Sequence, residues 1–164
     1  METCTPGVVH PRKLWLALVG IAFMMLAVSF PALAALGGDV NSVQEDQAHM
    51  KGSLQIHPAA AYSVHEITTS TRTVVREYVS PEGKVFGVAW QGPFVPDMQQ
   101  LLGTSFQQYA AAVQANRDTH ARRKPLNIQE PGLVVQTSGH VRAYSGRAYI
   151  PEMVPQGVSA ETIR

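Results

Sequence analysis

The sequence predicts a small α+β domain: an antiparallel sheet of about five strands, one long helix packed on one face, and a short N-terminal helix. The chain has 164 residues, 45% of them apolar and 15% charged, which suits a single globular domain. Several runs rich in Val, Ile, Thr and Tyr are joined by hairpin-length connections, which favours antiparallel pairing. One further segment has the apolar spacing of an amphipathic helix that can cover such a sheet.

The first 34 residues have the pattern of a secretory signal peptide. Arg12 and Lys13 precede an uncharged run over residues 14–28, Pro31 interrupts it, and Ala-Leu-Ala at 32–34 has the small-x-small pattern that a signal peptidase accepts. We therefore expect cleavage between Ala34 and Ala35. The alternative is an uncleaved membrane anchor, because the uncharged stretch approaches the ~20 residues that a bilayer span requires.

Cleavage at this site changes the composition of the protein. The remaining 130 residues carry 11 basic and 11 acidic side chains, and Cys4, the one cysteine, is removed. We expect no disulfide, no thiol nucleophile and no thiolate metal site. A net charge of zero argues against binding to nucleic acid. The expected location is the periplasm or the exterior of the cell, without stable membrane insertion after cleavage.

We divide the chain into a signal peptide (1–34), a segment with a short helix and a linker (35–61), an α+β domain (62–151) and a C-terminal tail (152–164). Ser42 and Glu45 are spaced as a capping box and predict a helix that ends near Lys51. Strands are expected over residues 62–69, 73–79 and 84–90, with a turn at 80–83. On the third strand, strict alternation puts Phe86, Val88 and Trp90 on one face.

The second half of the chain predicts the long helix and two more strands. Asp97 and Gln100 form a second capping arrangement, and the helix should extend from Met98 to about Ala115 despite Gly103. Residues 116–131 are expected to form a loop, followed by strands over 132–138 and 141–150. The tail should end in a helical turn capped by Ser159.

We find no local catalytic or metal-binding motif in the sequence, and we expect no metal and no cofactor. His49, His57 and His65 are spaced eight residues apart, but they fall on a helix, a loop and a strand, so a shared metal site requires three elements to converge. Glu66, Arg76 and Glu77 are candidates for cross-strand ion pairs. A hydrolase or transferase that uses His65 or His140 with a carboxylate remains an alternative.

Aromatic and basic residues supply the candidate binding surface, which comprises Phe94, Tyr144, Arg147 and Tyr149. Tyr144 and Tyr149 differ by an odd number on one strand, so they should face opposite sides of the sheet. Trp90 is expected in the core, because it shares its strand with other large apolar side chains.

The chain resembles a family of short exported bacterial proteins known as domain of unknown function twenty-eight forty-four. The resemblance rests on the segments Leu36-Gly37-Gly38, 62–66, 75–78, 85–90 and 101–103, on Gly92-Pro93 and Pro96-Asp97, and on 146–149 and 155–157. It implies export and a single domain, and it brings no catalytic residue. The sequence thus favours a non-catalytic exported module that binds another exported or envelope protein, with the small hydrolase or transferase as the alternative.

Overall fold

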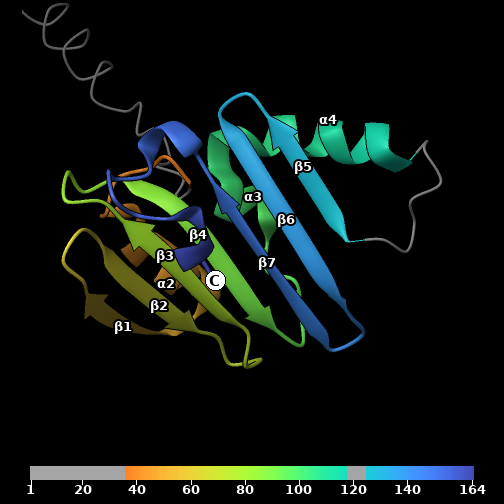
Figure 1. Cartoon of the computed structure of the whole chain (residues 1–164). Coiled ribbons are helices and arrows are strands. Elements are labelled where there is room, and N and C mark those ends of the chain that lie inside the picture. Colours follow the sequence, from red (N-terminus) through yellow and green to blue (C-terminus); the bar gives the residue numbers. More distant parts are fainter. Residues whose placement is uncertain (1–35, 118–124) are drawn as a thin grey trace, which may run out of the picture. The chain divides into compact units, whose positions relative to one another are not determined.

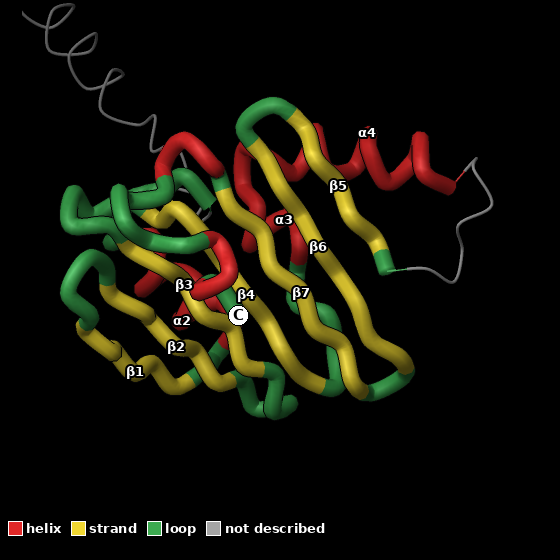
Figure 2. Tube along the Cα trace, in the orientation of Figure 1, coloured by secondary structure: helices red, strands yellow, loops and turns green. Residues whose placement is uncertain are grey.

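A computed structural model describes residues 36–117 and 125–164, which lie within one compact unit, Leu33–Arg164. Its centre is a seven-stranded sheet in which every neighbouring pair is antiparallel, in the order β1-β2-β3-β4-β7-β6-β5 (Figures 1 and 2). The strands are β1 (Ser53–Pro58), β2 (Ser63–Thr68), β3 (Val74–Val79), β4 (Val85–Gly92), β5 (Leu126–Glu130), β6 (Leu133–His140) and β7 (Ala143–Tyr149). The helices are α2 (Ser42–Met50), α3 (Met98–Leu102) and α4 (Phe106–Arg117), with short 3-10 turns at Gly103–Ser105, Pro151–Met153 and Ala160–Thr162.

The α+β class, the antiparallel sheet and both predicted helical regions are confirmed, but the sheet has seven strands rather than about five. The two strands that we did not predict are β1, in the expected linker, and β5, in the expected loop. Both lie at the edges of the sheet, and most of their residues are exposed. Edge strands have little buried surface, so their apolar alternation is short and easily taken for a loop.

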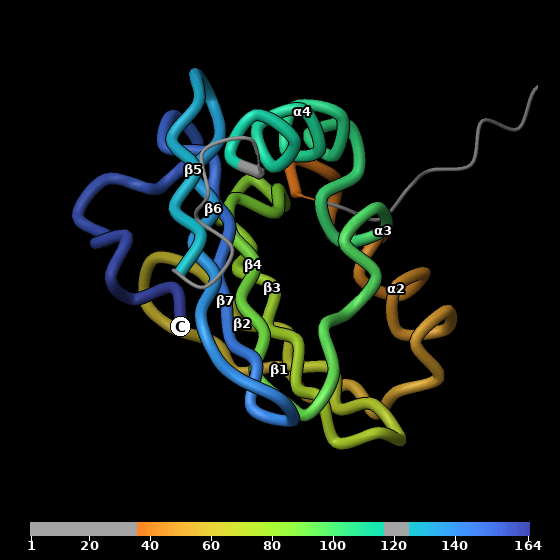
Figure 3. Tube along the Cα trace, turned by 90° about the vertical axis from the view of Figure 1, so that its right-hand side faces the viewer, coloured from red at the N-terminus to blue at the C-terminus, as the bar shows by residue number. Residues whose placement is uncertain are grey.

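The three α-helices of the described residues lie on one side of the sheet, and the C-terminal segment, residues 151–164, lies on the other (Figure 3). We call these the helix side and the tail side. The larger hydrophobic cluster fills the helix side, where Trp90 is 2% exposed and packs in the same cluster as Leu101 and Leu102. The expectation that Trp90 is a core residue is therefore confirmed. No helix in the described part of the chain is long and apolar enough to cross a membrane.

The predicted helix over residues 98–115 is present as two α-helices joined by one 3-10 turn. Asp97 caps α3 as expected, because its Oδ1 accepts hydrogen bonds from the main-chain N–H groups of Gln99 (2.9 Å) and Gln100 (3.2 Å). Gly103 then takes φ +49° and ψ −120°, a conformation outside the helical region. This glycine breaks the helix and lets α4 change direction after the buried residues of α3.

The first helix begins differently from the predicted capping box. Asn41 is its N-cap and has helical dihedral angles, and no side chain caps the helix. Ser42 instead donates its hydroxyl proton to the main-chain oxygen of Asp39. The end of the helix agrees with the prediction, since Lys51 takes the left-handed conformation and closes the last turn.

A β-bulge on β4 corrects the predicted face of Phe86. Tyr78 pairs with Gly87 and Val79 pairs with Val85, so Phe86 is an extra residue on its strand. Val85, Val88 and Trp90 therefore face the helices, whereas Phe86 packs on the tail side in the cluster that contains Ala89. The sequence prediction assumed strict alternation along the strand and therefore placed Phe86 on the same face as Trp90. That placement is wrong because the bulge shifts Phe86 to the opposite face.

The C-terminal segment is packed against the sheet rather than extending into solvent. Ile163 is fully buried over Gly87, where a Cβ would come within 2.8 Å of the isoleucine Cδ1. The predicted final turn is present, and the Ser159 hydroxyl caps it by accepting from the N–H of Glu161 at 3.2 Å. The segment thus covers the middle of the tail side and leaves both flanks open.

Candidate functional site

One row of side chains crosses the tail side through all seven strands, because the register places one residue of each strand opposite the next. The row runs Gln55, Glu66, Arg76, Ala89, Arg147, Gln136 and Asn127. Ala89, in the middle, lies where the C-terminal segment packs, and the polar members lie on both sides of it. The tail side is therefore polar at its flanks and apolar beneath the segment.

Arg147 connects this row to the C-terminal segment. Its Nε donates to Gln136 Oε1 at 2.7 Å, and its Nη1 donates to the main-chain oxygens of Ala160 (2.9 Å) and Ile163 (3.4 Å). The Glu161 carboxylate pairs with Nη2 at 3.0 Å. The planar guanidinium can make these contacts at once because its donors point in several fixed directions.

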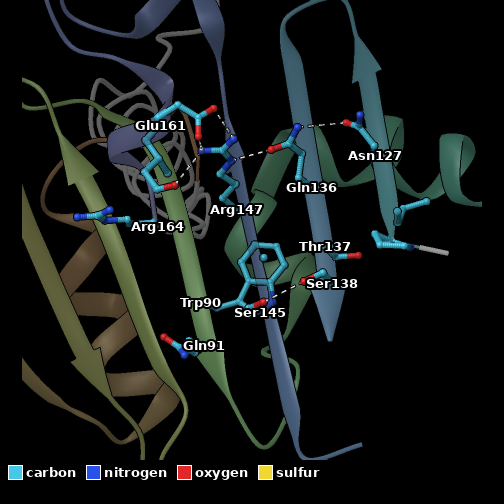
Figure 4. Close-up of a pocket in the computed structure, with 14 residues that line it drawn as sticks. Trp90, Gln91, Asn127, Gln136, Thr137, Ser138, Ser145, Arg147, Glu161 and Arg164 are labelled. Atoms are coloured by element: carbon cyan, nitrogen blue, oxygen red, sulfur yellow. Dashed lines mark hydrogen bonds and ion pairs between the residues drawn. The ribbon is translucent and has the colours of Figure 1, made fainter. Parts of the chain in front are cut away.

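Beside this contact a cleft of about 630 Å³ opens on the tail side (Figure 4). We call it the amide cleft, because uncharged amide and hydroxyl side chains predominate among its polar groups. These are Gln91, Asn127, Gln136, Thr137, Ser138 and Ser145. They come from four strands, and the Gln136 amide is held between Arg147 and Asn127, whose Oδ1 accepts from Gln136 Nε2 at 3.4 Å.

A second concavity of about 600 Å³ lies on the other flank of the C-terminal segment. Glu66 and Arg76 form an ion pair of 2.8 Å there, which confirms one of the cross-strand pairs expected from the sequence. The Tyr78 hydroxyl fixes the chain between the two hollows, because it donates to the main-chain oxygen of Arg164 at 2.9 Å and accepts from its N–H at 3.0 Å. Glu66 and Arg76 on this flank are thus paired with each other, and Tyr78 is paired with the main chain of Arg164.

The structure does not bring the four candidate binding residues together. Arg147 lines the amide cleft, but Tyr149 packs into the apolar cluster on the tail side. Tyr144 lies on the helix side, where it lines a different cleft with Trp90. The two tyrosines therefore face opposite sides of the sheet, as their spacing predicted, while Phe94 is 58% exposed in the connector before α3.

Glu77 does not form the cross-strand ion pair for which the sequence made it a candidate. It lies on the helix side, 1% exposed, against the fully buried Asp46 of α2. Burial, together with the neighbouring Asp46 carboxyl, raises the pKa of Glu77 to about 9, so Glu77 is protonated at neutral pH. Two ionised carboxylates would have no proton to share, whereas protonated Glu77 can donate to one carboxylate oxygen of Asp46. The Gln100 side-chain amide donates to the second oxygen, Asp46 Oδ1.

We did not predict this buried pair, although the sequence contains a signal for it. Val75, Glu77 and Val79 alternate along β3, so the glutamate occupies a position of the buried face. Asp46 likewise follows Val43 at helical spacing, and Val43 is 1% exposed. A charged residue at a core position predicts a buried partner.

The histidines considered for catalysis or metal binding lie on both sides of the sheet, with His49 on α2 at the helix side. His57 lines the concavity on the tail side, whereas His65 lies on the helix side, and burial lowers the pKa of His65. Ser63 Oγ is 3.1 Å from His65 Nε2, but the side chain is only 7% exposed and lines none of the clefts described above. His140 is exposed at the far end of β6. Across residues 36–117 and 125–164, no group of three or more His, Cys, Asp and Glu side chains could hold a metal ion.

The fold and the site define a small α+β domain in which a polar face of the sheet lies beside a C-terminal segment that is hydrogen-bonded to it. The chain belongs to the family of proteins of unknown function DUF2844, whose family model matches residues 32–163. This confirms the family resemblance found in the sequence. We found no match among curated proteins and none among solved structures.

Proposed function

We propose that the protein is an exported, non-catalytic binding module, and that the amide cleft is its ligand site. The observation that carries this proposal is the cleft itself, in which amides and hydroxyls from four strands converge within about 630 Å³. Ligand sites are usually concave, and their oriented polar groups determine how the ligand is held. Rigid strands hold these groups in place, so little order has to be created on binding.

The charged groups in and around the cleft support binding rather than chemistry. Arg147 and Glu161 are paired with each other and with the C-terminal segment. The buried carboxyls lie on the opposite side of the sheet, Asp46 on α2 and Glu77 on β3. A hydrolase needs an acid or base within hydrogen-bond reach of its substrate, and the burial of His65 disfavours that alternative.

Export is supported by the signal-peptide pattern of residues 1–34 and by the family match, which begins at residue 32. A domain whose family begins where the expected leader ends fits a mature protein that starts near Ala35. The ligand should then be a component of the cell envelope or another exported protein.

Capture from envelope extracts tests this function. Immobilised protein should retain one or more components after crosslinking, and the double variant Gln91→Ala/Asn127→Ala should retain less of them. Gln55→Ala is the matched control, because Gln55 is an exposed amide on the same side of the sheet and outside the cleft. Equal capture by the wild type and by the double variant contradicts the proposal.

A further inference from the structure

We infer that the amide cleft binds a neutral, hydroxyl-rich chain, that is, an uncharged oligosaccharide. This inference rests on the proposed function and specifies the chemistry of its ligand. Three features of the cleft support it: the kind of polar group that it offers, the pairing of its charges, and the position of its floor on paired strands within the sheet.

The first feature is the predominance of groups that both donate and accept hydrogen bonds. Gln91 and Asn127 are exposed primary amides, and Ser138 and Ser145 are hydroxyls whose Oγ atoms lie 3.3 Å apart. Amides and hydroxyls each carry donor and acceptor capacity in one side chain. A sugar hydroxyl has the same dual capacity, so each can pair with these groups in either direction.

The second feature is that the charges at the cleft are already paired or directed elsewhere. The Glu161 carboxylate neutralises Arg147, whose guanidinium also contacts Gln136 and the main chain. Figure 4 shows the Arg164 side chain directed away from Asn127 and Gln136. A charged ligand group beside Gln91, Asn127 or Ser138 would lose hydration without gaining a counter-charge next to it, which disfavours its binding among these side chains.

The third feature excludes the usual way in which a sheet binds a peptide. Peptides add as an extra strand to an exposed sheet edge and gain affinity from main-chain hydrogen bonds. The floor of the amide cleft is formed by β4, β7 and β6. Along the cleft β4 and β7 are paired on both sides, and β6 is paired with β5 as far as Thr137. A ligand over β4 and β7 can therefore bind only through side chains.

The dimensions of the cleft suit a short chain of sugars. Gln91, Ser145 and Ser138 follow one another across β4, β7 and β6, and Asn127 continues the neighbouring row onto β5. Four adjacent strands span roughly 14 Å at about 4.8 Å per step. Pro125, which is exposed, lines the end of the cleft beside β5 and provides apolar contact for the C–H groups of a sugar ring.

Titration with neutral hexasaccharides tests the inference. We use the full chain as it is produced on expression and follow the side-chain amide signals of Gln91 and Asn127 by NMR, with maltohexaose, cellohexaose, chitohexaose and mannohexaose as probes. At least one should bind saturably, and Asn127→Ala and Gln91→Ala should each weaken binding about tenfold, the effect of losing one hydrogen bond. Gln55→Ala should change the affinity less than about twofold, and thermal unfolding verifies that each variant is folded.

The other outcomes overturn the inference in distinguishable ways. If no hexasaccharide binds while capture from envelope extracts still depends on Gln91 and Asn127, the ligand class is wrong and the proposed function stands. If a galacturonic acid hexasaccharide binds more tightly than every neutral probe, the requirement for an uncharged ligand is wrong. If neither hexasaccharides nor envelope components depend on the cleft, the inference and the proposed function both fail.

Discussion

Arg147 Nη1 donates to the main-chain oxygen of Ala160 at 2.9 Å, and this contact joins β7 to the C-terminal segment. On its other side the same guanidinium donates to the Gln136 amide, so one side chain positions both the segment and a wall of the amide cleft. The arginine that we expected to bind a ligand directly thus shapes the cleft through its contacts within the protein.

Arg147→Lys should therefore lower the free energy of unfolding by ~1–3 kcal/mol, because lysine keeps the charge but cannot reach Gln136, Ala160 and Glu161 together. Urea denaturation measures this loss, and hydrogen exchange at the Ile163 amide should become faster. Lys84→Ala removes an exposed ion pair with Asp39 and should change stability by less than ~0.5 kcal/mol. Equal effects of the two substitutions would contradict the assigned role.

The buried acid pair predicts a decrease in stability at alkaline pH. The pKa of Glu77 is raised from 4.5 to about 9 in the folded protein, so between these values the folded state holds a proton that the unfolded chain has released. The free energy of unfolding must then fall as pH rises. Burial lowers the pKa of His65 from 6.5 and gives the opposite slope at lower pH, so the measurement should cover pH 7 to 9.

Urea denaturation across this range should show a loss of about 2 kcal/mol, since one proton changes the free energy of unfolding by at most about 1.36 kcal/mol per pH unit. Glu77→Gln should reduce the slope, because the amide does not titrate while it keeps the shape and a donor for Asp46. Glu130→Gln, at an exposed position, should leave the slope unchanged. A wild-type stability that is constant or increases from pH 7 to 9 would show that the pair does not share a proton.

The sequence predicted the elements that bury much apolar surface and was less informative about those that bury little. The core of β4 and the apolar residues of the helical region stood out because Val88 and Trp90 alternate along the strand, and Met98, Leu101 and Leu102 have helical spacing. The edge strands β1 and β5 were missed, since tertiary pairing rather than local pattern determines them. The bulge at Phe86 depends on the register with β3, which a single strand does not encode.

The candidate site was harder to predict than the fold, for a physical reason. The amide cleft is assembled from Gln91, Asn127 and Ser138, which are distant in sequence and of residue types that are common on any protein surface. Aromatic residues are the more usual markers of a binding surface, yet Tyr149 belongs to the apolar cluster. Only the strand order β4-β7-β6-β5 brings the amides and hydroxyls together.

Gly103→Ala distinguishes a broken helix from a continuous one. In a continuous helix this change would stabilise the protein by ~1 kcal/mol, because alanine has the higher helix propensity. Since Gly103 has φ +49°, alanine is strained there and should instead destabilise the protein by ~1–3 kcal/mol. Thermal or urea unfolding gives the sign directly, with the exposed Gln107→Ala as a control near zero. A stabilised Gly103→Ala variant would favour the continuous helix that the sequence predicted.

The signal-peptide hypothesis predicts a mature chain that begins at Ala35. Intact-mass measurement on protein isolated from the producing cell should show loss of residues 1–34. Replacing Ala34 by a bulky residue should block processing, because the peptidase site accepts small side chains. The same substitution at Ala61, far from the expected cleavage site, should not prevent the removal of residues 1–34. A full-length product in wild-type cells would favour the membrane-anchor alternative.

Trp90 and Gly146 form the last testable pair, because the indole lies over the glycine on the neighbouring strand. Their residues are opposite in the β4–β7 register, and a Cβ on Gly146 would come within 2.3 Å of the indole Cζ2. Gly146→Ala must therefore displace the ring, which should destabilise the protein by ~1–3 kcal/mol and shift its fluorescence toward that of exposed indole. Trp90→Ala leaves a large cavity and should lower stability by ~3–5 kcal/mol.

After removal of residues 1–34, Trp90 is the only tryptophan, so the fluorescence of the protein reports the surroundings of this side chain. Ser145→Ala, one residue away and on the other side of the sheet, is the control and should leave the emission unchanged. Wild-type emission that is already quenched freely by acrylamide would contradict the buried position of the ring.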